Sequence, residues 1–214
     1  MTLEDALAAG AFEPDLSLWD AWSPEEVARR LEGLRPPWYV AGGWAIELFL
    51  GEQLREHEDL EIAVPRERFP EIADALAEFE LFVPGRDLTG RSLVWPLAEA
   101  PDALERHHQT WVREPPTGQW RLDVFREPSS RDTWIFRRDE RIRLPYSAVI
   151  ERSDGGIPYS RPELVLLFKA KRPEEPKNEA DLAAVLPRLD RARRSWLAEA
   201  LALVHPGHPW LEGI

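Results

Sequence analysis

The sequence of 214 residues contains no cysteine, which excludes disulfide bonds, thiolate catalysis and zinc–thiolate sites. It also lacks any uninterrupted apolar run of about 18 residues, so no transmembrane helix is predicted. The first residues, Met1 to Asp5, show neither the basic nor the apolar region of a secretory signal. We therefore expect a cytoplasmic protein that does not interact with membranes.

Basic residues are scarce relative to acidic ones. There are 27 Lys and Arg residues against 39 Asp and Glu residues, which gives a formal net charge of −12. Nucleic acid is an unlikely partner for such a chain, because neutralising phosphates requires a basic surface. A metal ion, a polyamine or an amino-sugar is a more suitable partner for an acidic surface. The apolar fraction of 43% and charged fraction of 31% are typical of a globular protein.

Hydrophobic periodicity predicts an α/β (α+β) fold, in which helices and strands alternate before a helical C-terminal part. Two glycines follow a short apolar run at 38–41, and alternating residues at 59–64 indicate a half-buried strand. Helices are expected at 23–34 (stopped by Pro36-Pro37), 44–50, 66–79, 162–171, 178–186 and 190–204, and strands at 38–41, 59–64, 81–83, 93–95 and 118–125. We place a domain boundary at 154–156, between a domain at 1–155, with a helical extension at 1–35, and a C-terminal helical subdomain at 156–214.

Three carboxylates carry the clearest chemical signal. Asp59 and Glu61 share one face of the predicted strand, and Asp123 lies on another alternating strand opposite its apolar face. A solvated outer face is the simpler interpretation of Asp59 and Glu61. If the three acids converge, however, their mutual repulsion requires a cation. Oxygen ligands without thiolate favour Mg²⁺ or Mn²⁺, and two such ions form the clamp used in phosphoryl and nucleotidyl transfer.

The double glycine offers a complementary feature. Gly42 and Gly43 precede a predicted helix, whose free N–H groups and positive dipole end are suited to a phosphate. Such a pair alone is often only a tight turn. A following acid-x-acid strand some 16 residues later makes the phosphate interpretation sharper.

Gly42-Gly43-Trp44-Ala45-Ile46 and His57-Glu58-Asp59-Leu60-Glu61-Ile62 together resemble the signature of the DNA polymerase β-like nucleotidyltransferase superfamily. The likeness is greatest to its aminoglycoside and lincosamide nucleotidyltransferase-like branch. Trp120-Arg-Leu-Asp123-Val is similar to the strand that bears the third acid in that family. Later segments also match, so the resemblance covers about residues 38–210.

The resemblance implies a nucleotidyltransferase fold, with a mixed β-sheet flanked by helices and a C-terminal helical bundle. It implies transfer of a nucleoside monophosphate, probably AMP from ATP, to a hydroxyl of a small, aminoglycoside-like acceptor. By position, Asp59, Glu61 and Asp123 would be catalytic and hold the Mg²⁺ or Mn²⁺ ions, with Asp123 also a candidate general base. Gly42 and Gly43 would hold the triphosphate through their backbone.

The chain departs from the family pattern at two positions. Glu61 stands where many members have Asp, so the carboxylate is one methylene longer. In the broader superfamily a small hydroxyl residue often follows the glycines, but here the residue is Trp44, as in the aminoglycoside-type branch. Trp44 is assigned by its position to nucleotide binding. Arg55 and Lys169 are candidates to supply the missing contact to the nucleotide, and each is otherwise an ordinary surface cation.

Two other functions fit the same fold. A toxin-like nucleotidyltransferase would modify tRNA or protein, although the charge of −12 argues against tRNA. A non-catalytic nucleotide-binding module would account for Glu61. If the acceptor is polycationic, acids such as Glu163, Glu179 and Asp181 are expected to line its site, unless they are solvated surface acids. The sequence leaves the oligomeric state and the acceptor's identity open.

Overall fold

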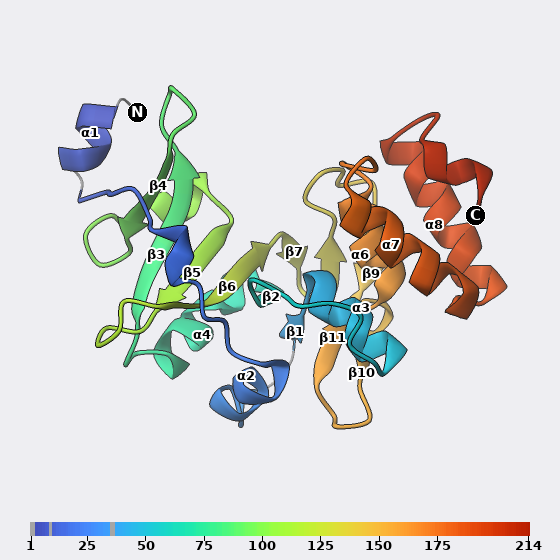
Figure 1. Ribbon diagram of the computed structural model, residues 1–214, viewed down its shortest axis with the longest axis horizontal. Coiled ribbons are helices and arrows are strands. Elements are labelled where there is room, and N and C mark those ends of the chain that lie inside the picture. Colours follow the sequence, from blue (N-terminus) through green and yellow to red (C-terminus); the bar gives the residue numbers. More distant parts are fainter. Residues whose placement is uncertain (1–2, 9, 35–36) are drawn as a thin grey trace. The chain divides into compact units, whose positions relative to one another are not determined.

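The computed structural model describes residues 3–8, 10–34 and 37–214. The chain forms two compact units (Figure 1), of which the first is Met1–Trp38 with His57–Glu127 and the second is Tyr39–Glu56 with Pro128–Ile214. Residues 154–156 lie within the second unit, in the turn between β10 (Ile150–Arg152) and β11 (Pro158–Ser160). The domain boundary at 155 therefore remains a prediction from sequence, and the two compact units divide the chain at other positions.

The first unit contains five strands in the order β2–β6–β5–β3–β4. β2 and β6 are parallel, and the remaining neighbours are antiparallel. The strands are β2 (Glu61–Pro65), β3 (Glu80–Arg86), β4 (Ser92–Pro96), β5 (Gln109–Arg113) and β6 (Trp120–Glu127). The helices are α1 (Leu3–Ala8), α2 (Pro24–Arg30), α4 (Phe69–Ala75) and α5 (Ala103–Arg106), with 3₁₀ turns at Leu16–Leu18 and Arg66–Arg68.

Two helices of the first unit are shorter than predicted. Ser23 caps α2 by accepting a hydrogen bond from the Glu26 amide, so the helix begins where it was predicted, but it ends at Arg30 instead of residue 34. Gly33 follows with φ of 85°, a left-handed conformation that a helix does not continue through. The predicted stop at Pro36 lies outside the described residues. The predicted helix at 66–79 begins with a 3₁₀ turn because Pro70 fixes the α-helical start near Phe69.

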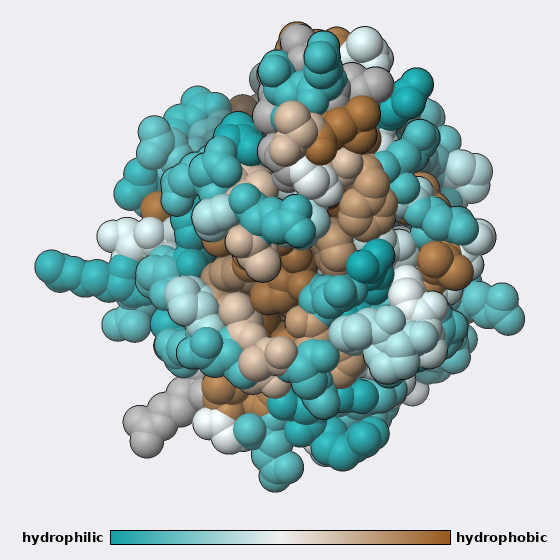
Figure 2. Space-filling model, turned by 90° about the vertical axis from the view of Figure 1, so that its left-hand side faces the viewer, coloured by the Kyte–Doolittle hydropathy of each residue, from teal (hydrophilic) through white to brown (hydrophobic). Residues whose placement is uncertain are grey.

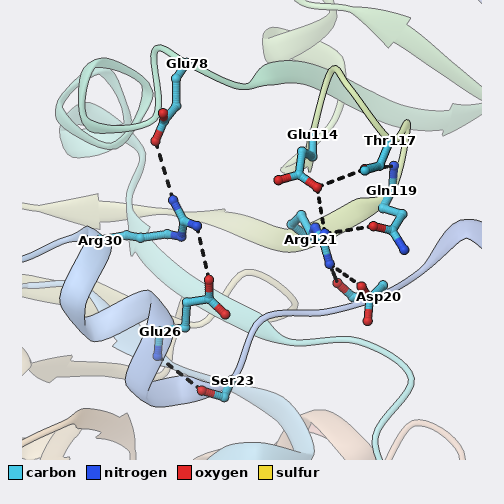
Figure 3. Close-up of polar contacts among 9 residues, drawn as sticks. All are labelled: Asp20, Ser23, Glu26, Arg30, Glu78, Glu114, Thr117, Gln119 and Arg121. Atoms are coloured by element: carbon cyan, nitrogen blue, oxygen red, sulfur yellow. Dashed lines mark hydrogen bonds and ion pairs between the residues drawn. The ribbon is translucent and has the colours of Figure 1, made fainter.

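The segment between α1 and α2 is fixed to β6 by two side chains (Figure 3 shows one of them). Arg121 donates to the Asp20 carbonyl at 2.7 Å and to the Glu114 carboxylate at 2.6 Å. Trp120 donates from its indole to the Asp15 carbonyl at 3.0 Å. Because Trp120 is buried, this contact joins the N-terminal segment to the hydrophobic core of the unit.

The second unit holds two groups of three strands, of which one belongs to the eight-stranded sheet and one is a separate sheet, and the helical C-terminal part (Figure 1). In one sheet β11 pairs in parallel with β1 (Tyr39–Val40) and antiparallel with β10. The other is antiparallel, with order β7–β8–β9, from Ser129–Ser130, Thr133–Ile135 and Arg143–Pro145. The helices are α3 (Gly42–Leu50), α6 (Pro162–Lys169), α7 (Pro176–Val185) and α8 (Arg191–Val204), with 3₁₀ turns at Tyr146–Ala148, Leu186–Arg188 and Pro209–Glu212.

The predicted mixture of helices and strands is confirmed, including the three C-terminal helices. α6 contacts α3, α7 and α8, so the longest helices of the second unit share one packed region. Within the described part of the chain, no helix has both the length and the apolar character needed to cross a bilayer. On the face drawn in Figure 2, hydrophobic residues gather in a hollow bordered by hydrophilic ones.

Candidate active site

The acidic strand prediction is correct in part. Glu61 begins β2 and lies directly opposite Asp123 of β6 in the parallel register. Asp59 was predicted to belong to the strand, but it is exposed and precedes it, although the Leu60 carbonyl already accepts the Asp123 amide at 2.9 Å. Ala63, two residues after Glu61 on the same face, is only 3% exposed. β2 is therefore covered on both faces, as is typical of a parallel strand.

Asp123 is the electrostatic centre of the acidic group. Its side chain is buried, and its Oδ2 accepts a hydrogen bond of 2.6 Å from the amide of Gln109. Its Oδ1 is buried without a hydrogen-bond partner among the described residues. Burial raises the pKa of Asp123 well above its usual value, and the neighbouring charges of Glu61 and then Asp59 raise it further. The structure therefore brings all three predicted acids into electrostatic contact.

The fit of these acids to a metal ion depends on which ligands the ion receives from elsewhere. Among the residues the structure describes, no group of three or more His, Asp or Glu side chains could hold a metal ion as arranged. Mg²⁺ nevertheless is usually bound by one or two carboxylates together with waters and substrate phosphates. Glu61 and Asp123, whose Oδ1 has no hydrogen-bond partner among the described residues, supply carboxylates of this kind, and Asp59 acts on Asp123 from beside them. The donors fit Mg²⁺ or Mn²⁺ bound with a triphosphate better than a closed structural site.

The double glycine begins a helix instead of preceding one. Gly42 and Gly43 are the first residues of α3, and Gly42 has a φ of 59°. A residue with a Cβ is disfavoured in this left-handed conformation, so the backbone itself requires glycine. The N-cap is Ala41, whose side chain has no acceptor for the first-turn amides. Those N–H groups are the type that binds phosphate at helix N-termini.

The predicted nucleotide contacts Trp44 and Arg55 belong to the same unit as the glycines. Trp44 is half-buried in the first turn of α3. The loop after α3 is held by Glu47, whose buried carboxylate accepts the amides of Leu54 at 3.0 Å and Arg55 at 3.2 Å. The Arg55 guanidinium donates to the Glu56 carbonyl at 3.2 Å. The roles of Trp44 and Arg55 toward a nucleotide remain predictions.

Lys169 has a carboxylate partner within the second unit. Its Nζ lies 2.7 Å from Asp181 Oδ2 and 3.3 Å from Asn178 Oδ1, and Asp181 and Asn178 are both buried. The ion pair gives Lys169 a structural role beside the nucleotide role predicted for it. It also uses Asp181, which was expected to line a cationic acceptor site.

Glu163 is engaged in the same way. Its buried carboxylate accepts two hydrogen bonds from Arg193, at 2.6 and 2.9 Å. Both bonds end on Oε2 of Glu163, and charge-assisted hydrogen bonds of this kind are stronger than those between neutral groups. Glu163 is therefore neutralised inside the fold by Arg193, and its place in an acidic acceptor lining stays a prediction. Glu179, by contrast, is exposed.

Two residues of the acidic site, Gln109 and Arg126, were not predicted from the sequence. Gln109 was not predicted because no strand was predicted at 109–113. The signal for this strand was the alternation of Gln109 and Trp111 with the buried Thr110. Arg126 is buried on β6, and its guanidinium donates to the carbonyls of Leu104 at 2.8 Å, His107 at 2.6 Å and Gln109 at 3.1 Å. Arg126 thus holds the backbone that positions Gln109 beside Asp123. The available signal was an Arg next to the apolar run Val124-Phe125 of the same strand.

The family model of aminoglycoside-2''-adenylyltransferases matches residues 25–86 of the chain. That stretch includes Gly42, Gly43, Asp59 and Glu61. No curated protein matches the chain.

Three solved structures share the fold. One is ANT(2'')-Ia in complex with adenylyl-2''-tobramycin, at a TM-score of 0.54 and 14% identity, covering 84% of this chain and 95% of that one. The solution structure of the antibiotic-resistance factor ANT(2'')-Ia gives a TM-score of 0.52 and 13% identity, covering 88% and 91%. The lincosamide antibiotic adenylyltransferase LnuA, bound to lincomycin, gives 0.50 and 14% identity, covering 75% and 92%. The predicted nucleotidyltransferase fold and the resemblance to the aminoglycoside and lincosamide branch are confirmed.

Proposed function

We propose that the protein is a metal-dependent nucleotidyltransferase that moves AMP from ATP to a hydroxyl of a small, antibiotic-like acceptor. One observation carries the proposal: Glu61 and the buried Asp123 lie opposite each other on adjacent strands, with Asp59 close enough to raise the pKa of Asp123. Buried like charges destabilise a fold unless a cation joins them. The family model and the shared fold support nucleotidyl transfer as the chemistry for which that cation is required.

Each residue has a role in this mechanism. Asp59 and Glu61 would hold Mg²⁺ or Mn²⁺, which supplies charge neutralisation for the triphosphate and the developing phosphoryl charge. Gly42 and Gly43 bind triphosphate oxygens through backbone N–H groups. Asp123 accepts the proton of the acceptor hydroxyl, and Gln109 fixes the orientation of its carboxylate. The hydroxyl oxygen forms a bond to the α-phosphorus while the bond to the β-phosphate bridging oxygen breaks, and pyrophosphate leaves.

The test combines turnover with metal binding. The protein is incubated with ATP, Mg²⁺ and a panel of aminoglycosides and lincosamides, and pyrophosphate release and the adenylylated acceptor are measured. Mn²⁺ binding in the presence of a non-hydrolysable ATP analogue is followed by electron paramagnetic resonance. Asp59→Asn should abolish both transfer and tight Mn²⁺ binding, because it removes a carboxylate from the group.

Asp154→Asn is the matched control, since Asp154 is an exposed acid in the β10–β11 turn. It should leave both measurements unchanged. An Asp59→Asn variant that keeps normal transfer would contradict the assignment of Asp59. ATP binding without pyrophosphate release for any acceptor, tRNA and protein included, would instead support a non-catalytic nucleotide-binding module.

A further inference from the structure

A cavity of about 410 Å³ lies within the first unit, between the β3–β4 hairpin and the start of β5. This volume is in the range of small-molecule sites. Its walls combine apolar residues, among them Pro84, Leu93 and Trp111, with polar ones, namely Arg86, Ser92, His107, His108 and Gln109. The cavity is therefore suited to a ring-bearing molecule of modest size.

The walls of the cavity are held in place by ring stacking. His107 stacks on Trp95 at a centroid distance of 5.6 Å, and His108 stacks on Phe125 at the same distance. Gly85 lines the cavity next to His107, and a Cβ at this position would lie only 2.6 Å from His107 Nε2. The close approach requires glycine, so the shape of this wall is specified by the sequence.

The cavity leads to the candidate general base. Gln109 lines it and donates to Asp123 Oδ2 at 2.6 Å. Trp111 also lines it and is the direct cross-strand neighbour of Asp123. Paired residues on neighbouring strands project to the same side of the sheet. A molecule held in the cavity is thus one side chain away from the carboxylate that would accept the hydroxyl proton.

The charge of the cavity lining disfavours a polycation. Its described lining contains no Asp or Glu, and its one permanently charged residue is Arg86, whose guanidinium also donates to the Gly90 carbonyl at 2.6 Å. A polyamine needs several carboxylates to replace its hydration. Two acids that the sequence offered for this purpose, Glu163 and Asp181, are paired with Arg193 and Lys169.

We propose that this cavity binds the acceptor, and that it selects a hydroxylated, ring-bearing molecule carrying at most one positive charge. The proposal rests on the proposed function in treating this molecule as an acceptor, but the binding itself does not require transfer. An apolar ring would pack against Trp111 and the proline and leucine walls, and its hydroxyl would lie toward Gln109 and Asp123.

The test measures binding by calorimetry in the absence of ATP and metal, with two probes. Lincomycin has a single basic amine, and tobramycin is a polyamine. The wild-type protein should bind lincomycin more tightly than tobramycin. Ser92→Phe places a phenyl ring in the cavity lining and should weaken lincomycin binding at least about tenfold by occupying the space. Ser130→Phe, at an exposed position of β7, is the matched control and should have no effect.

A charge reversal tests the selectivity separately. Arg86→Glu introduces an acid in the cavity lining and should strengthen tobramycin binding several-fold, and more at low ionic strength than at high. Arg91→Glu makes the same change in charge on the same hairpin, outside the lining, and should have a much smaller effect. Thermal melting of each variant verifies that it folds.

Four results would overturn the proposal: no lincomycin binding, lincomycin binding that Ser92→Phe leaves intact, tighter binding of tobramycin by the wild type, or equal effects of Arg86→Glu and Arg91→Glu. Failure of the proposed function has a different outcome. A protein that binds lincomycin in the cavity yet releases no pyrophosphate would disprove the transferase and keep the cavity assignment. Efficient adenylylation of tobramycin would support the transferase and disprove the selectivity proposed for the cavity.

Discussion

The two units of the molecule contain buried acids in contrasting environments. In the second unit two buried acids each have a cation of their own, since Glu163 is bound by Arg193 and Asp181 by Lys169. In the first unit Asp123 is equally buried, but its charged neighbours are the acids Glu61 and Asp59. The same residue types thus occur in a neutralised and an unneutralised environment.

This difference separates structural acids from functional ones. A buried carboxylate with an internal cation is already neutralised. Removing either partner leaves the other charge buried and unpaired, which lowers the stability of the fold. A buried carboxylate among like charges lowers stability until a cation arrives from solution. Spacing along the chain does not distinguish the two cases, because both kinds of acid lie on regular elements.

The largest expected effect follows from changing Asp123 to Asn. Transfer should fall by about 10³-fold, because the proposed proton acceptor is lost. The free energy of unfolding of the metal-free protein should stay the same or rise, because a buried charge beside other acids is removed. Pyrophosphate release and urea denaturation measure the two quantities. Asp74→Asn, an exposed acid of the same unit, is the control, and a strong loss of stability in Asp123→Asn would contradict the comparison.

Changing Asp181 to Ala should have the opposite profile. Lys169 would be left largely buried without its carboxylate, so the free energy of unfolding should fall by about 3 kcal/mol. Urea denaturation measures the loss. Glu179→Ala on the same helix should change stability far less, because Glu179 is exposed. The double variant Lys169→Met, Asp181→Leu should recover most of the loss, and failure to recover it would show that the pair is not the cause.

The two glycines that flank α3 offer a third test. Gly42 begins the helix with φ of 59°, and Gly51 caps its other end with φ of 76°. Alanine at either position should cost about 1 kcal/mol of stability, since both adopt the left-handed conformation. Only Gly42→Ala should also raise the KM for ATP, if the first-turn amides bind the triphosphate. An equal rise in Gly51→Ala would assign the effect to the helix as a whole.

Much of the fold was predictable because local patterns determined it. Ser23, Gly51 and Asp190 mark helix ends that the structure confirms, and each acts through its own backbone or cap hydrogen bond. Strand β5 was missed, and with it Gln109, because its residues are half-buried and mix aromatic, polar and charged types.

The site could be predicted only where alternating apolar and polar residues show which side chains share one face of a strand. Asp123 and Glu61 were assigned to strands correctly, and pairing places them opposite each other. Ion-pair partners were not predictable, because Glu163 and Arg193 lie 30 residues apart on helices whose packing decides the contact. The cationic partners of Glu163 and Asp181, two acids expected in an acceptor lining, were not foreseen for this reason. Arg126 is similar, since its three carbonyl partners are brought together by the turn before β5.

The smallest expected effect concerns pH, and it compares one histidine from each unit. Burial lowers the pKa of His107, with Arg106 and Arg126 lowering it further, and burial likewise lowers the pKa of His205. Each imidazole is therefore protonated more readily in the unfolded chain than in the folded one. Unfolding takes up protons as the pH falls through the ordinary histidine range, so stability decreases toward acid pH and is restored as the pH rises. His107→Gln should flatten this dependence between about pH 7.5 and 5.5 by on the order of 0.5 kcal/mol, as measured by urea denaturation at each pH. His205→Gln tests the second unit in the same assay. An unchanged pH profile in both variants would show that neither imidazole is kept neutral by its surroundings.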